Sequence, residues 1–389
     1  MHYSMGQFWL ILLCAAGVTT ACTPLTIRLA RATGAMDVPR DDRRMHHRVI
    51  PRIGGLAIFI GVSLAFYLAV RLGYCDPGRH DIPRERLYGL LFSSALMYLL
   101  GMIDDYLDLP AWVKLLGQIG VATVAFCFGV QLTFIASFFG RTTFTGVVCY
   151  LLTILWIVGV TNTINLVDGL DGLAAGIVAI ASFCIAYVAY IFGYYAICFP
   201  LLAVAGGCLG FLPWNFSPAK TFMGDGGSLY LGFMIASLSL LQPVKSTTVV
   251  AVIMPSLVLS LPILDTFFAI VRRLVNHKPI MQADNGHLHH RLMRAGLGQR
   301  RTVLCMYGVC GIMSMAAIMV ARGLYKETVG LAIIAILYLY VLLTDPNRGK
   351  VHAGSEGDAA RRGRRQSARS GNAERSEGKA RRGEADRRQ

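Results

Sequence analysis

Long apolar runs recur along this chain, and they constrain its fold more than any other feature. Most are close to the roughly 20 residues that a helix needs to cross a lipid bilayer. We count eleven runs: 7–29, 54–72, 87–103, 111–128, 146–164, 173–192, 196–213, 227–241, 248–271, 303–321 and 327–344. Because lipid offers no hydrogen-bond partners to the backbone, such segments must be helical. The sequence therefore predicts an all-α polytopic membrane protein with about eleven transmembrane helices.

Composition excludes a soluble globule. Hydrophobic residues make up 55% of the 389 residues and charged residues only 15%, against about 25% charged residues in a typical soluble domain. The first run has no Lys or Arg before it and is too long for the apolar part of a signal peptide, so we expect a retained anchor. Residues 129–145 alternate and are rich in β-forming types, which predicts a short hairpin at the surface.

The positive charge is concentrated at the C-terminal end. Residues 346–389 hold 13 Lys and Arg against 6 Asp and Glu, whereas the whole chain has a net charge of +15. This segment has no apolar periodicity, so we expect a disordered tail that follows one polytopic domain over 1–345. No basic face interleaved with aromatic residues is present, and we expect no nucleic-acid partner.

Loop charges predict the orientation, because cytoplasmic loops carry an excess of Lys and Arg. Alternate loops fall into two sets, and one set carries 15 of these residues against 7 in the other. The richer set comprises 31–53, 104–114, 162–172, 214–226 and 272–302. With eleven spans in the plasma (inner) membrane, the N-terminus then lies outside and the basic tail lies in the cytoplasm.

Polar residues of catalytic types gather in this same loop set, and they point to a site on the cytoplasmic face. Charges near a membrane are costly, so their placement indicates function. The residues are Asp37, Arg43, Arg44 and His46; Asp104, Asp105 and Asp108; Asn162, Asn165, Asp168 and Asp171; Lys220 and Asp225; and His287, His289 and His290.

Each cluster also has a plainer interpretation. The Asp104–Asp105 pair could end a helix, although paired carboxylates also favour Mg²⁺ together with substrate phosphates. Asn165, Asp168 and Asp171 recur at a spacing of three, but the glycines among them favour a broken helix end. Asp225 could be an N-cap, or could approach a phosphate or metal between its flanking glycines. The histidines could form a basic surface patch, grip a pyrophosphate or bind Zn²⁺, for which no Cys or Glu lies nearby.

Four motifs taken together resemble the polyprenyl-phosphate N-acetylhexosamine-1-phosphate transferase family. They are GMIDDYLDL, NxxNLVDGLDGLA, PAKTFMGDGGSLxLG and DxGHxHH, within a similarity that spans about 35–345. The histidine loop DNGHLHHRL looks like the branch that transfers GlcNAc-1-phosphate, because Leu288 interrupts the run of histidines expected for the MurNAc-pentapeptide branch. The eleven-span interpretation also suits the GlcNAc branch.

The resemblance implies roles for individual residues. Asp104 and Asp105 match the aspartate pair near the lipid phosphate, and Asn165 and Asp225 match positions that hold Mg²⁺, which Mn²⁺ could replace. Asp168 and Asp171 match acidic positions of the catalytic and nucleotide pocket, and the family's histidine positions are matched by His46, His287, His289 and His290. We expect the catalytic residues to be Asp104, Asp105, Asp168, Asp171 and His287. We expect substrate to be bound by Lys114, Asn162, Lys220, His46, His289 and His290.

The implied reaction moves a sugar-1-phosphate from a UDP-N-acetylhexosamine, here UDP-GlcNAc, to undecaprenyl phosphate with release of UMP. It would be the first membrane step of a cell-envelope polysaccharide such as lipopolysaccharide or a wall polymer. A direct transfer and a covalent route through an aspartate both remain open. The alternatives are a MurNAc-pentapeptide or other hexosamine donor and, more remotely, a prenyltransferase that uses DDYLD or a transporter. The oligomeric state is not predicted, and a homodimer is compatible with the sequence.

Overall fold

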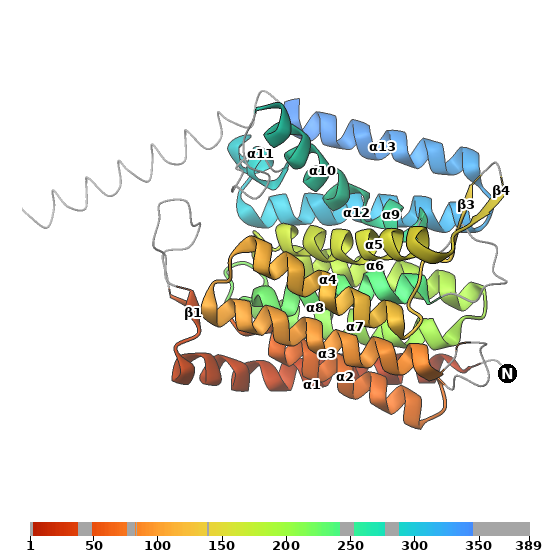
Figure 1. Ribbon diagram of the computed structural model, residues 1–389. Coiled ribbons are helices and arrows are strands. Elements are labelled where there is room, and N and C mark those ends of the chain that lie inside the picture. Colours follow the sequence, from red (N-terminus) through yellow and green to blue (C-terminus); the bar gives the residue numbers. More distant parts are fainter. Residues whose placement is uncertain are drawn as a thin grey trace, which may run out of the picture.

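Thirteen helices and four short strands make up the described part of the chain in the computed structural model (Figure 1). The structure describes residues 3–37, 49–75, 82, 84–137, 140–241, 253–276 and 288–344. The helices are α1 (Met5–Thr33), α2 (Gly55–Arg71), α3 (Arg84–Leu107), α4 (Ala111–Cys127), α5 (Gly146–Val167), α6 (Leu173–Ile191), α7 (Tyr195–Asn215), α8 (Gly224–Leu240), α9 (Ile253–Val258), α10 (Ser260–Val275), α11 (Leu288–Arg294), α12 (Gln299–Ala321) and α13 (Tyr325–Thr344). The strands are β1 (Met36–Asp37), β2 (Ile50–Pro51), β3 (Phe134–Ser137) and β4 (Gly140–Thr143).

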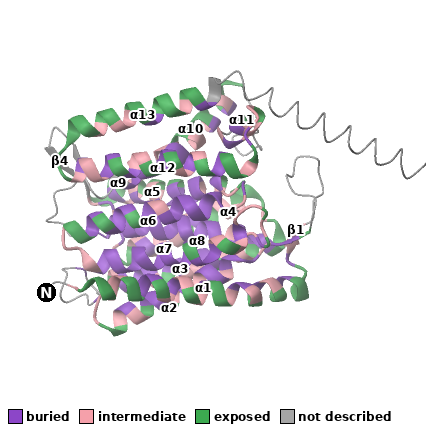
Figure 2. Cartoon of the chain, turned by 180° about the vertical axis from the view of Figure 1, so that it is seen from behind, coloured by how far each residue is buried: buried purple, intermediate pink, exposed green. Residues whose placement is uncertain are grey.

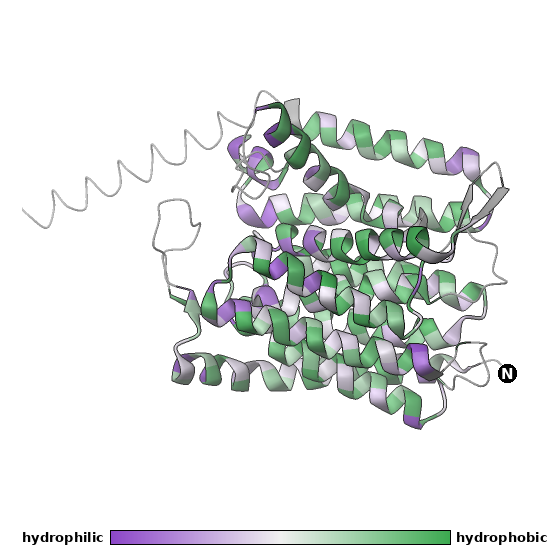
Figure 3. Cartoon of the chain, viewed as in Figure 1, coloured by the Kyte–Doolittle hydropathy of each residue, from purple (hydrophilic) through white to green (hydrophobic). Residues whose placement is uncertain are grey.

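Apolar helices dominate the fold, as the sequence predicts. Among the described helices, seven are long and apolar enough to cross a membrane, namely α1, α3, α5, α6, α7, α12 and α13, while α2 and α4 are apolar but shorter. Figure 3 shows apolar residues along the length of these helices. Large apolar side chains such as Leu155 and Ile336 are 69% and 65% exposed, which suits contact with lipid rather than with water. The chain is therefore an all-α polytopic membrane protein.

Helices α6, α7 and α8 form the buried centre of the bundle (Figure 2). Helix α7 packs against α1, α2 and α6, and α8 packs against α3 and α5. On α8 every residue except Asp225 is buried. The surrounding helices thus enclose α8, and its first turn carries Asp225 to the middle of one end of the bundle.

The expectation of one continuous helix over 248–271 is wrong for the part of this run that the structure describes. The chain forms α9 and then α10, with a break at Leu259. Pro262 explains the break, because it has no N–H to donate to the Val258 carbonyl and its ring would collide with that carbonyl.

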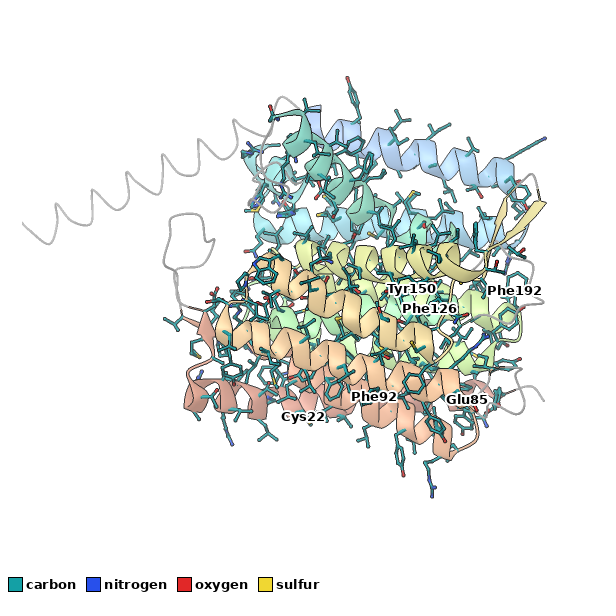
Figure 4. The ribbon with its side chains drawn as sticks, viewed as in Figure 1. Cys22, Glu85, Phe92, Phe126, Tyr150 and Phe192 are labelled. Atoms are coloured by element: carbon teal, nitrogen blue, oxygen red, sulfur yellow. The ribbon has the colours of Figure 1, made fainter. Side chains whose placement is uncertain are left out.

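The hairpin expected within 129–145 is confirmed, since β3 and β4 pair antiparallel. Beside it, the ring of Tyr150 at the start of α5 meets the ring of Phe126 near the end of α4, edge to face at 5.2 Å (Figure 4). Figure 1 shows this hairpin and the N-terminus at one end of the bundle, and β1 with α11 at the other. The loops that carry the predicted site residues belong to the end of β1 and α11.

Candidate active site

Backbone pairing brings the first loop against the start of α8. The Phe222 N–H donates to the Pro51 carbonyl at 2.8 Å, and the Gly54 N–H donates to the Phe222 carbonyl at 2.9 Å. Arg52 lies between these two hydrogen-bonded positions, directly before α2. The pairing therefore holds the Arg52 side chain over the first turn of α8.

Asp105 joins the end of α3 to the N-terminus of α8. Its two oxygens accept the backbone N–H of Asp225 at 2.8 Å and the backbone N–H of Gly226 at 2.9 Å. A carboxylate is favourable there because the first N–H groups of a helix have no partners within the helix. Asp225 is the second residue of α8 and not its N-cap, which is Met223. Asp105, whose side chain is buried, thereby positions Asp225.

Two glycines permit this close approach of α3 and α8. A Cβ on Gly101 would lie 2.4 Å from the Asp225 carbonyl oxygen, and a Cβ on Gly224 would lie 2.3 Å from the Arg52 carbonyl oxygen. Gly224 also has a φ of 68°, a backbone conformation that favours glycine. The GDGG sequence and the glycine three residues before the aspartate pair are therefore requirements of the site's geometry.

Arg52 binds three carboxylates and is a site residue that the sequence reasoning missed. Its guanidinium lies 3.1 Å from Asp105 Oδ1, 3.1 Å from Asp108 Oδ1 and 3.2 Å from Asp225 Oδ2. Burial alone would lower the pKa of Arg52, but the carboxylates of Asp105 and Asp225 raise it above its ordinary value. The available signal was its place directly before IGG and an apolar run, unlike the other arginines of that loop.

Lys114, on the first turn of α4, lies among three oxygens from three other helices. Its Nζ is 2.8 Å from Asp104 Oδ2, 2.8 Å from Asp225 Oδ1 and 3.3 Å from Asn165 Oδ1. Asn165 also donates from Nδ2 to Asp225 Oδ1 and, at 2.9 Å, to Ser228 Oγ. The structure thus brings together four residues that the sequence analysis singled out: Asp104, Asp225, Asn165 and Lys114.

These oxygens suit a hard divalent cation. Mg²⁺ is usually bound through one or two carboxylates, with substrate phosphates and water completing the shell. Asp225 and the amide oxygen of Asn165 supply oxygens of this kind, and the ammonium of Lys114 already marks the place as one for a cation. No group of three His, Cys, Asp or Glu with metal-site geometry occurs within the described ranges. The donor set therefore fits Mg²⁺ in company with a phosphate ligand.

The α5–α6 connection confirms the broken helix end. Helix α5 ends at Val167, Asp168 follows it, and Gly172 adopts a φ of 79° before α6. Burial raises the pKa of Asp168 well above its ordinary value, and the nearby carboxylates of Asp225 and Asp105 add to this effect. Asp171 instead binds the backbone before α8, since its Oδ2 accepts the Ala219 N–H at 3.0 Å.

A cavity of about 1140 Å³ opens beside these carboxylates. Seven of the residues predicted for the site line it: Asp37, Asn165, Asp168, Asp171, Lys220, Asp225 and His290. Arg52 and Arg31 also line it. Lys114 and Asp104 lie behind this lining: Lys114 contacts the lining residues Asp225 and Asn165, and Asp104 contacts Lys114. With both carboxylates and cations in its wall, the cavity suits a polar ligand that carries phosphate groups.

The remaining predicted residues lie in different surroundings. Asn162 is not among the residues that line the cavity, and it exchanges amide hydrogen bonds with Gln118 on α4, at 2.5 and 3.2 Å. The ammonium of Lys220 lies 5.1 Å from the centre of the Trp214 ring. His289 is buried, and its ring lies 4.3 Å from that of His290. His46, His287 and the tail over 346–389 lie outside the described residues.

Comparisons with known proteins identify the family of this chain. A family model described as glycosyl transferase family 4 matches residues 87–242. The "Probable undecaprenyl-phosphate N-acetylglucosaminyl 1-phosphate transferase" of Bacillus subtilis is 42% identical over 321 residues, which cover 82% of this chain and 87% of that protein. The decaprenyl-phosphate N-acetylglucosaminephosphotransferase of Mycolicibacterium smegmatis is 34% identical over 363 residues, which cover 87% and 89%. The undecaprenyl-phosphate alpha-N-acetylglucosaminyl 1-phosphate transferase of Escherichia coli K12 is 26% identical over 306 residues, which cover 77% and 78%. The chain belongs to glycosyl transferase family 4, the polyprenyl-phosphate N-acetylhexosamine-1-phosphate transferases.

Proposed function

We propose that this protein transfers N-acetylglucosamine-1-phosphate from UDP-GlcNAc to undecaprenyl phosphate and releases UMP. The observation that carries the proposal is that Asp225, Asn165 and Arg52 lie together at the wall of one large cavity, with Lys114 bound to Asp225 and Asn165 from behind. The names of the relatives support GlcNAc-1-phosphate as the transferred group and a polyprenyl phosphate as the acceptor. The product would begin a cell-envelope polysaccharide.

The reaction exchanges one phosphoanhydride for another. An oxygen of the lipid phosphate bonds to the β-phosphorus of UDP-GlcNAc, and the bond from that phosphorus to the bridging oxygen breaks, so that UMP leaves. Little net driving force is needed, and the difficulty lies in bringing two anionic reactants together. Catalysis then depends on positioning and on charge stabilisation rather than on a strong nucleophile.

The residues of the cavity fit this task. Asn165 and Asp225 would hold Mg²⁺, for which Mn²⁺ could substitute; when bound, the ion supplies positive charge at the diphosphate. Lys114 and Arg52, with Lys220 and His290 farther along the wall, would donate to phosphate oxygens.

In this proposal Asp104 and Asp105 position other residues, whereas Asp168 acts on the substrate. Asp105 holds α8, and Asp104 accepts the Leu109 N–H at 2.8 Å as well as Lys114, so both are occupied by structural contacts. Asp168 lines the cavity, and its carboxyl group has no hydrogen bond or ion pair within the described residues. Its raised pKa suits a group that takes a proton from, or orients, the lipid phosphate.

We further propose eleven spans in the plasma membrane, with the site and the tail in the cytoplasm and the N-terminus outside. The unequal loop charges support this orientation, since the loops of the site end carry 15 Lys and Arg against 7 at the other end. The position of the N-terminus and of β1 at opposite ends of the bundle agrees with it (Figure 1). The apolar helices would give the polyprenyl tail a lipid-facing surface beside the site.

A transfer assay on membranes that carry this chain tests the proposal. The assay supplies Mg²⁺ with undecaprenyl or decaprenyl phosphate and compares UDP-GlcNAc, UDP-GalNAc and UDP-MurNAc-pentapeptide as labelled donors, with EDTA as the control. We expect EDTA-sensitive label from UDP-GlcNAc in the lipid phase. Transfer from the MurNAc-pentapeptide donor alone would contradict the assignment of the donor, and no transfer from any donor would contradict the proposed function.

A further inference from the structure

We infer that Lys114 and Arg52 compete with the divalent cation for the same oxygens, so that metal and donor diphosphate bind to this site cooperatively. This inference rests on the proposed function, because it takes a diphosphate as the ligand of the cavity. Beyond that function, the inference says that each of the two ligands should raise the affinity of the site for the other.

Lys114 holds the oxygens that a metal needs. Its Nζ lies 2.8 Å from Asp225 Oδ1 and 3.3 Å from Asn165 Oδ1, the two residues expected to bind the metal. A third oxygen, Asp104 Oδ2, lies 2.8 Å away. Carboxylate and amide oxygens around one ammonium imitate the shell of a metal ion. A divalent cation on Asp225 and Asn165 would therefore lie beside the ammonium and be repelled by it.

Arg52 holds the other side of the same carboxylate. Its guanidinium contacts Asp225 Oδ2 at 3.2 Å while it also contacts Asp105 at 3.1 Å. Both oxygens of Asp225 thus face a cationic group of the protein itself. A metal ion that binds Asp225 has to displace these contacts. Unless another anion is present, Lys114 and Arg52 then lose part of the negative charge that balances them.

A diphosphate supplies the missing anion. Arg52, Asn165 and Asp225 all line the cavity, so a phosphate bound there lies next to the groups that the metal displaces. The lysine stem is flexible and its ammonium can move to a phosphate oxygen. The phosphate then balances the charges of Lys114 and Arg52, which the metal ion has displaced from Asp225, and the metal ion balances the charge of the phosphate. Since linkage is reciprocal, both affinities should rise by the same factor.

Binding measurements on the full-length protein in nanodiscs test this inference without turnover. Mn²⁺ is the probe, followed by the loss of the free-ion EPR signal, and UDP is the diphosphate, with UDP and Mn²⁺ without protein as the blank. In the wild type we expect UDP to tighten Mn²⁺ binding by about tenfold or more. Lys114→Met should bind Mn²⁺ more tightly than the wild type when UDP is absent, and UDP should then add little.

Lys326→Met is the charge-matched control, because Lys326 at the start of α13 is exposed and does not line the cavity. Its Mn²⁺ affinity without UDP should stay within about twofold of the wild type, well inside a coupling of typical size. Arg52→Gln serves as a second test that does not require Lys114→Met to fold, and it too should reduce the coupling.

Two results would overturn the inference. The first is equal Mn²⁺ affinity with and without UDP in the wild type. The second is Mn²⁺ binding without UDP that is no tighter in folded Lys114→Met and Arg52→Gln than in the wild type. If either occurs in protein that still transfers GlcNAc-1-phosphate, the coupling is wrong and the proposed function stands. If UDP does not bind even at saturating Mn²⁺, the proposed function fails as well.

Discussion

A single methyl group at Gly101 should inactivate this protein without removing any functional group. Gly101 lies on α3, where it faces the first turn of α8. In Gly101→Ala the new Cβ would lie 2.4 Å from the Asp225 carbonyl oxygen and 2.7 Å from the Gly226 Cα. Ordinary contacts of this kind begin at about 3.5 Å, so α3 and α8 must separate by about 1 Å.

That displacement determines the size of the expected effect. A shift of about 1 Å at a reacting centre costs on the order of 100-fold in rate, or about 2.7 kcal/mol. Overpacking costs about 1–3 kcal/mol of stability, and the better helix propensity of alanine returns up to about 1 kcal/mol. We therefore expect a variant that still folds, has a slightly lower unfolding temperature and has about 1% of the wild-type turnover.

The transfer assay, with thermal unfolding measured on the same sample, checks this prediction. Gly159→Ala is the matched control, because Gly159 on α5 has nothing within 4 Å of the position of its Cβ. The control should keep its turnover and its stability. If Gly101→Ala retains turnover within about threefold of the wild type, the close approach of α3 and α8 does not position Asp225, and the reasoning fails.

Three other perturbations test separate parts of the account. Asp168→Asn should stabilise the metal-free protein near neutral pH, because the raised pKa means that ionising Asp168 costs stability. The gain should vanish below the unfolded-state pKa of about 3.9, grow as the pH rises from there to the folded-state pKa and stay constant above it, and unfolding curves with the same gain at every pH would contradict this. Asp225→Ala should insert normally yet lose Mg²⁺-dependent turnover, and full activity would refute the metal assignment. Deletion of residues 350–389 should change turnover by less than about tenfold, or about 1.4 kcal/mol, and a larger loss would give the tail a role in transfer.

The helices were predictable from sequence because lipid enforces them. Each of the eleven apolar runs contains helix in the described residues, and most helix bounds lie within a few residues of the run. The exception is 248–271, where the helix breaks because Pro262 lacks an N–H. Counting apolar residues does not detect such a break. The β3–β4 hairpin followed from its alternation.

The sequence singled out several residues that the structure brings into contact, but it did not indicate the contacts themselves. The cost of charge at a membrane explains why Asp104, Lys114, Asn165 and Asp225 stood out, and the structure brings them together. Arg52 did not stand out, because its loop is rich in arginine and only its place before IGG and an apolar run distinguishes it from the others. The pairing of oxygens with cations depends on how α3, α4, α5 and α8 pack against one another. The pattern of residues along the chain does not predict that packing.

The direct test of the central claim follows the phosphorus of the donor. UDP-GlcNAc labelled with phosphorus-32 in the β-phosphate is supplied to the purified protein with undecaprenyl phosphate and Mg²⁺, and the lipid and aqueous phases are counted. Transfer of a sugar-1-phosphate predicts label in the lipid and unlabelled UMP in the water. Label that remains with the nucleotide as UDP, with the sugar alone in the lipid, would contradict the account.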